Sequence, residues 1–203
     1  MEAPDGLGTG AAVATGGLGL SGGKEVIDMN PSTPPSALPE GVWQTLLAHA
    51  FTLVDKITRR GISDPFWTFG GGTVLMLRPE GEIDFVASPN LTAQPYDEWT
   101  LLGRTVKVET AAEIVAKKLW HRGDRATARD LFDLSLVIER EPEALATASP
   151  YLVRHRDAFL TQIEQRRAVL RAQFEAIDAL DYQPQYDEAV ELASRFLKQL
   201  PAV

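Results

Sequence analysis

Cysteine is absent from the sequence, histidine occurs only three times, and long apolar runs are missing. Without cysteine the chain has no disulfide, no thiolate nucleophile and no Cys-based metal site, which fits a reducing cytoplasmic location. His49, His121 and His155 lack the mutual spacing of metal ligands, so we predict no zinc site. No apolar stretch approaches the roughly 20 residues that a membrane span needs, and we predict no membrane partner.

Positive charge is also scarce, since 20 Lys and Arg face 28 Asp and Glu and the net charge is -8. Binding that coats nucleic acid generally rests on many contacts between cations and phosphates, so this balance argues against it but is compatible with a local basic patch. The serines form no nucleophile elbow, and no dinucleotide-binding fingerprint is present. Hydrophobic residues at 44% and charged residues at 24% are otherwise typical of a soluble globular protein.

Residues 1–38 differ in composition from the rest of the chain. They contain half of the sixteen glycines, four prolines and a single basic residue, Lys24. Such a segment buries too little apolar surface to offset the entropy lost on ordering. We therefore predict a disordered Gly/Pro-rich leader, with ordered structure starting near residue 39.

The remaining pattern predicts an α+β fold with few strands and a helical C-terminal half. Apolar residues recur at helical spacing over 42–60, and short β-branched stretches predict strands at 82–87 and 104–108. Thr110 and Glu113 have the spacing of a capping box that opens a helix ending near Arg122. We expect further helices from about 125 to 141, over 151–180 and over 186–199.

Two of these helices carry charges on their apolar faces. At about 100° per residue, Lys118 and Arg122 share the apolar stripe of the first helix, and Asp130, with Asp133 at its edge, shares that of the second. Charges on an apolar face are costly unless they are paired. We therefore expect Lys118 or Arg122 to meet Asp130 or Asp133, either as a structural ion pair or as part of a cleft that handles phosphates and protons.

Three consecutive glycines precede Thr73 and a short apolar segment. Glycines before a helix let backbone amides approach an anion closely. Glu82 and Asp84 lie two residues apart on the predicted strand 82–87, so their carboxylates point to one face and could share a magnesium ion. Glycine bends and acidic pairs on exposed strand faces are both common, so neither feature is specific alone.

Two stretches resemble the AbiEii/AbiGii toxin family of nucleotidyltransferases, which are related to DNA polymerase β-like transferases. The sequence WTFGGGTVLMLR at 67–78 is similar to the family's glycine signature. EIVAKKL at 113–119, followed by Arg122 and by ARDLFDL at 128–134, is similar to its later Lys and Arg-Asp-x-x-Asp motifs. The resemblance covers about residues 40–140, and we expect a nucleotidyltransferase-like core at 39–142 and a C-terminal helical region at 143–203.

The resemblance implies Mg²⁺-dependent transfer of a nucleoside monophosphate from a nucleoside triphosphate to an acceptor such as tRNA, countered by a cognate antitoxin. It implies catalytic roles for Lys118 and Asp130 and metal binding by Glu82 and Asp84. The nucleotide-binding residues it implies are Gly71, Gly72, Thr73 and Arg122.

The sequence departs from the family pattern between the glycine signature and the Lys motif. Only nine residues separate Gly72 from Glu82, and the expected Arg-x-Ser-x-Asp-x-Asp stretch is missing. In one interpretation Glu82 and Asp84 are themselves the metal pair. In the other, which we favour, they form a later strand and the metal strand is missing, because 82–108 resembles the segment just before the Lys motif. The second interpretation predicts a non-catalytic module that binds RNA or a partner protein.

Overall fold

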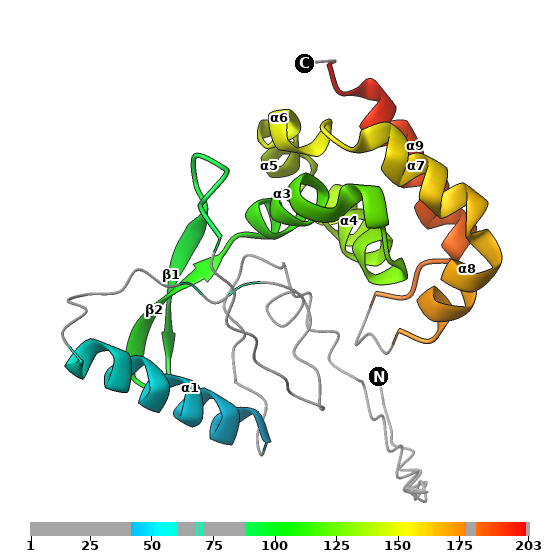
Figure 1. Cartoon of the computed structure of the whole chain (residues 1–203). Helices are drawn as coiled ribbons and strands as arrows, with labels where there is room; N and C mark the ends of the chain where they lie inside the picture. Colours follow the sequence, from blue (N-terminus) through cyan, green and yellow to red (C-terminus); the bar gives the residue numbers. More distant parts are fainter. Residues whose placement is uncertain (1–41, 61–67, 69, 71–87, 178–181, 202–203) are drawn as a thin grey trace, which may run out of the picture.

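The structure, a computed structural model, describes residues 42–60, 68, 70, 88–177 and 182–201. It is an α+β arrangement in which one helix and a hairpin lie beside a larger group of helices (Figure 1). The elements in chain order are α1 (Val42–Arg59), β1 (Tyr96–Leu101), β2 (Arg104–Glu109), α3 (Ala111–Arg122), the 3₁₀ turn η1 (Gly123–Arg125), α4 (Ala128–Arg140), α5 (Pro142–Thr147), α6 (Ser149–Leu152), α7 (Arg156–Gln165), α8 (Arg167–Glu175) and α9 (Tyr186–Gln199). The predicted fold class is confirmed.

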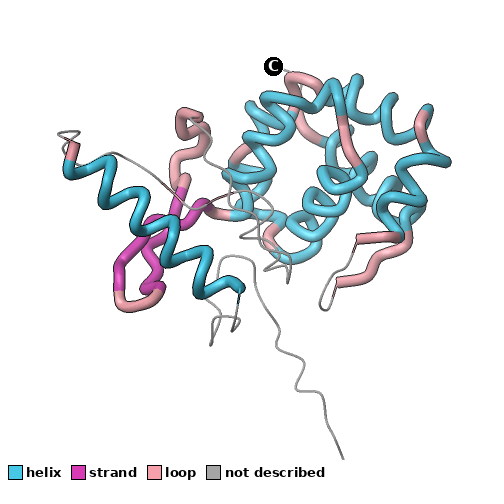
Figure 2. The backbone as a smooth tube through the Cα atoms, turned by 60° about the horizontal axis from the view of Figure 1, so that its bottom comes forward, coloured by secondary structure: helices cyan, strands magenta, loops and turns pink. Residues whose placement is uncertain are grey.

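The two strands form an antiparallel hairpin that packs against α1 (Figure 2). Leu102 and Gly103 make the two-residue turn with φ of 50° and 75°, the left-handed conformation that such turns require. The apolar side of the hairpin and α1 share a small cluster of buried residues: Leu47, Phe51, Trp99, Leu101, Val106 and Val108. The cluster holds the hairpin on α1 by burying the inward side of both strands.

The predicted strand at 104–108 is confirmed as β2, but β1 was not predicted. Its sequence, YDEWTL, carries two acidic residues and buries only Trp99 and Leu101. Acidic residues are poor strand formers, and two buried positions are too few to define an alternating pattern. β1 is therefore specified mainly by its pairing with β2, with Trp99 opposite Val106.

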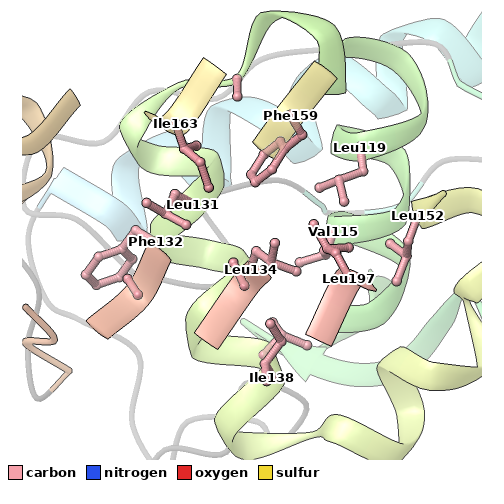
Figure 3. Packing of buried hydrophobic residues seen from close by; sticks show 14 of the residues in the cluster. Val115, Leu119, Leu131, Phe132, Leu134, Ile138, Leu152, Phe159, Ile163 and Leu197 are labelled. Atoms are coloured by element: carbon pink, nitrogen blue, oxygen red, sulfur yellow. The ribbon is translucent and has the colours of Figure 1, made fainter. Parts of the chain in front are cut away.

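The larger hydrophobic core lies among the helices, with α4 at its centre. α4 packs against α3, α5, α8 and α9. Leu131 and Leu134 of α4 meet side chains from α3, α7 and α9, such as Val115, Phe159 and Leu197 (Figure 3). Residues on both sides of residue 142 contribute to this one core.

The single helix predicted for 151–180 is wrong, and its residues form separate elements. α6 ends at Leu152, α7 begins at Arg156, and a break at Arg166 separates α7 from α8. Phe159 and Ile163 of α7 and Leu170 and Phe174 of α8 are all buried. A break of one residue leaves the apolar spacing nearly unchanged, and periodicity alone therefore does not detect it. The helix predicted at 186–199 is confirmed as α9.

Several predictions concern residues outside the described part of the chain. These are the leader at 1–38, the strand at 82–87 and the glycine signature except for Thr68 and Gly70. Among the helices that are described, none has the length and apolar character required to span a bilayer.

Candidate functional site

Helices α3 and α4 lie next to each other and carry the charged residues that the sequence singled out. The turn η1 follows α3 directly, and two further residues, Ala126 and Thr127, lead into α4. Thr127 opens α4 with a full capping box: its hydroxyl accepts a hydrogen bond from Asp130 N, and the Asp130 carboxylate accepts one from Thr127 N. Asp130 is thus fixed by the start of its own helix.

Five residues of the helix pair form what we call the charged cluster: Lys118, Arg122, Arg129, Asp130 and Asp133. Lys118 Nζ contacts Asp133 Oδ2 and lies 3.8 Å from Asp130 Oδ1. Arg122 Nη2 lies 2.6 Å from Asp130 Oδ1, and Arg129 Nε lies 3.2 Å from Asp133 Oδ1. The prediction that the cations of the first helix meet the carboxylates of the second is confirmed.

The members of the charged cluster differ in burial, and Arg122 is the most exposed of them. The side chains of Asp130 and Asp133 are 2% and 0% exposed, whereas Arg122 is 45% exposed. Two buried carboxylates therefore hold three cations in place, which leaves one excess positive charge, and one cation reaches solvent. Fixed cations in a partly buried setting are suited to binding phosphate groups.

Asp130 has little capacity left for a substrate. Its Oδ1 accepts a hydrogen bond from Arg122, and its Oδ2 accepts from Thr127 N at 3.1 Å and from Thr127 Oγ1 at 2.8 Å. Its geometry is that of a residue that orients Arg122 and starts α4.

A second network lies at the other end of α3 and was not predicted. The Glu113 carboxylate is fully buried and accepts hydrogen bonds from Leu91 N at 2.9 Å, Thr92 N at 2.8 Å and Thr92 Oγ1 at 2.7 Å. Lys117 Nζ lies 3.2 Å from Glu113 and 2.6 Å from Glu109. The spacing of Glu113 and Lys117 by four residues was the available sequence signal, whereas Glu109 had none.

The capping box predicted at Thr110 and Glu113 is only half formed. Thr110 Oγ1 accepts a hydrogen bond from Glu113 N at 3.3 Å. The Glu113 side chain binds the loop at 91–92 instead of returning to Thr110, and Thr110 N donates to Pro95 O. The loop amides need an acceptor in the interior, and Glu113 supplies it.

The other predicted site residues are not described. Gly71, Gly72 and Thr73 of the nucleotide set, and the proposed metal ligands Glu82 and Asp84, all lie outside the described residues. Their convergence with Lys118 and Asp130 therefore stays a prediction. Of the glycine signature, Thr68 and Gly70 are described, and both lie against Glu109.

The described carboxylates are not grouped as a cluster of three or more metal ligands. Within 42–60, 88–177 and 182–201, no three His, Asp or Glu side chains are grouped so that they could share a metal ion. Asp130 and Asp133 are each engaged by cations. The candidates for Mg²⁺ ligands from the sequence, Glu82 and Asp84, lie outside the described residues.

Comparison with known families matches residues 77–200 to the family described as nucleotidyl transferase AbiEii toxin of a Type IV TA system. The match covers more than half of the chain, and the chain therefore belongs to this family. No curated protein and no solved structure matches. The matched segment contains the whole charged cluster and extends beyond the 40–140 of the resemblance, but it begins after Gly70–Thr73.

Proposed function

We propose that the protein transfers a nucleoside monophosphate from a nucleoside triphosphate to an RNA acceptor such as tRNA, and that a cognate antitoxin counters the resulting growth inhibition. Membership of the AbiEii toxin family supports the reaction class. The observation that carries the proposal is the charged cluster, where buried Asp130 and Asp133 fix Lys118 and Arg122 beside each other. Such an arrangement can neutralise phosphate charge without reorganising.

Each residue of the proposed site has a distinct role. Lys118 contacts the transferred phosphate group, and the more exposed Arg122 binds another phosphate of the triphosphate. Asp130 orients Arg122. Backbone amides of Gly71, Gly72 and Thr73 approach the triphosphate. If Glu82 and Asp84 are themselves the metal pair, they would hold a Mg²⁺ ion that neutralises charge on the phosphates.

Labelling of an acceptor tests the reaction directly. The full chain is incubated with MgCl₂, bulk tRNA and each of the four α-labelled nucleoside triphosphates in turn. We expect label in tRNA with the wild type and a loss of about 100-fold or more for Lys118→Met, because one positioned charge group is removed. Asp84→Asn is expected to abolish labelling if Glu82 and Asp84 are the metal pair.

Lys56→Met is the matched control, since Lys56 is an exposed lysine on α1. It should label tRNA as the wild type does, and circular dichroism verifies the fold of every variant. Absence of labelling with all four nucleotides and the wild type would contradict the proposed reaction.

A second candidate is a non-catalytic member that binds RNA or a partner protein. It is favoured by the position of the family match, which begins after the glycine residues 70–73, and by the engagement of Asp130 and Asp133 with cations. This candidate predicts tRNA binding by the wild type, measured by filter retention, without any labelling. Arg122→Ala should then weaken binding, whereas Lys56→Met should not.

A further inference from the structure

The last residue of β2, Glu109, contacts both the neighbouring helix α3 and a segment that is distant in the sequence. Its Oε1 accepts a hydrogen bond from Thr68 Oγ1 at 3.2 Å, across 41 residues of chain. The same oxygen accepts one from Lys117 Nζ of α3 at 2.6 Å. Glu109 and Lys117 are only 11% and 13% exposed, so this is a nearly buried ion pair.

Gly70 lies so close to Glu109 that no side chain fits between them. A Cβ atom on Gly70 would overlap Oε2 and Cδ of the Glu109 carboxylate. A glutamate side chain can usually move away from such an overlap. Here its carboxylate is held by Lys117 and Thr68, and a displacement would break the ion pair. Position 70 therefore requires glycine for steric reasons.

The adjacent lysines of α3 are committed to different partners. Lys118 lies against Asp133 and Asp130 of α4, whereas Lys117 lies between Glu109 and Glu113. Consecutive helical residues point about 100° apart, which lets one helix serve both networks. Lys117 is thus engaged by two carboxylates on the side of α3 that faces the end of β2.

We propose that Glu109, supported by Lys117, is a positioning residue that sets where Thr68 and Gly70 lie relative to α3, and that Lys117 acts through Glu109. The proposal rests on the proposed function in assigning nucleotide binding to the glycine signature and Lys118. It adds that the contacts of Glu109 with Thr68 and Gly70 fix the start of that signature. The steric part can be tested without any activity.

A thermal double-mutant cycle tests the contact between Gly70 and Glu109. Gly70→Ala should lower Tm by about 2–4 °C in the wild type, the shift expected for a cost near 1 kcal/mol in a chain of this size. In a Glu109→Ala background the same change should cost nothing measurable, because the overlapping carboxylate is gone. Lys117 keeps Glu113 as a partner there, so no charge is orphaned. Glu109→Thr, suited to a strand end, is run alongside as a second background.

Gly103→Ala provides the additive control for this cycle. Gly103 has φ of +75°, and no heavy atom of the described residues lies within 4 Å of a Cβ built there, so the cost of the substitution is conformational and local. It should lower Tm equally in all backgrounds. Equal losses for Gly70→Ala in the wild type and in both Glu109 variants would overturn the proposal.

A second cycle tests whether Lys117 acts only through Glu109. The dissociation constants of ATP, GTP, CTP and UTP are measured by calorimetry with MgCl₂ present. For the nucleotide bound, Lys117→Met should weaken binding about tenfold in the wild type but less than twofold in the Glu109→Ala background, as for residues in one network. Lys117→Arg should restore most of the affinity by keeping the ion pair.

The outcomes separate this proposal from the proposed function. A similar loss for Lys117→Met in both backgrounds would show that Lys117 contacts the nucleotide directly and would overturn its assignment as a supporting residue. A wild type that binds none of the four nucleotides contradicts the proposed function, and the thermal cycle then decides whether Glu109 holds Gly70.

Discussion

The guanidinium of Arg122 lies 2.6 Å from a carboxylate oxygen of Asp130 that water hardly reaches. The other oxygen of Asp130 accepts hydrogen bonds from the backbone and hydroxyl of Thr127. One carboxylate therefore begins α4 and orients a cation of α3. This double use explains how an acidic residue is accommodated on an otherwise apolar helix face.

Replacing Asp130 should be among the more damaging changes in the chain. Asp130→Ala removes the helix cap and a buried charge that faces Lys118 and Arg122, and we expect a loss of about 3–5 kcal/mol in the free energy of unfolding. Asp130→Asn keeps an acceptor for Thr127 and should lose less. Urea denaturation followed by circular dichroism measures both. Asp124→Ala, at a half-exposed site in η1, is the control and should change the free energy of unfolding by no more than about 0.5 kcal/mol.

Removing Glu113 should release the loop at 88–95 from α3. Glu113→Ala leaves the amides of Leu91 and Thr92 without their acceptor, and we expect a loss of about 2–3 kcal/mol. Hydrogen exchange of those two amides should accelerate in the variant. Exchange at the same rate as in the wild type would contradict the role of Glu113, and Glu143→Ala, an exposed change on α5, serves as the control.

The hairpin turn offers a stabilising substitution. Leu102 has φ of 50° and is 46% exposed, so it is strained and its side chain gains little from burial. Leu102→Asn places the residue preferred at this turn position and should raise the free energy of unfolding by about 0.5–1 kcal/mol. Leu53→Asn on α1, with 41% exposure in helical conformation, should not stabilise. A destabilised Leu102→Asn variant would show that the Leu102 side chain has a partner of its own.

Alkaline stability should depend on Tyr182. Burial, followed by the negative charge of nearby Glu139, raises the pKa of Tyr182 well above its usual value of 10.0. A raised pKa in the folded state means that stability is complete below about pH 10 and is lost as the pH rises above it, because the unfolded chain ionises first. Tyr182→Phe should therefore flatten the fall of Tm above pH 10 and change Tm little at pH 7.

Tyr186→Phe is the informative comparison for Tyr182. Burial also raises the pKa of Tyr186, but its hydroxyl donates a hydrogen bond to Ile163 O at 2.7 Å. Removal of this hydroxyl should lower the free energy of unfolding by about 1 kcal/mol already at pH 7. An unchanged alkaline slope in Tyr182→Phe would show that other groups cause the fall.

The parts of the fold that could be predicted from the sequence are those with local, periodic signals. Helical spacing located α1, α3, α4 and α9, and the charges at Lys118, Arg122, Asp130 and Asp133 broke that spacing in a way that required pairing. The break at Arg166 left almost no periodic signal, and β1 depends on its partner strand more than on its own residues.

The contacts made by Glu109 could not be predicted from local sequence patterns, for a different reason. Thr68 and Glu109 are 41 residues apart, and no motif or period links them. Only the three-dimensional structure shows that a side chain at position 70 would overlap the carboxylate of Glu109 at the end of β2. The family motifs identified the helix pair but not the residues that support the glycine signature.

A single residue, Thr110, separates the end of β2 from the start of α3. The hairpin and α1 have an apolar cluster of their own, whereas the charged cluster lies between helices of the larger core. A rotation about the backbone of Thr110 would move Glu109 together with the hairpin, and it is opposed by the ion pair of Glu109 with Lys117 and by the hydrogen bonds of Glu113 to the loop at 91–92. The orientation of the hairpin relative to α3 therefore depends on the two backbone torsion angles of Thr110 and on the contacts that keep them from changing.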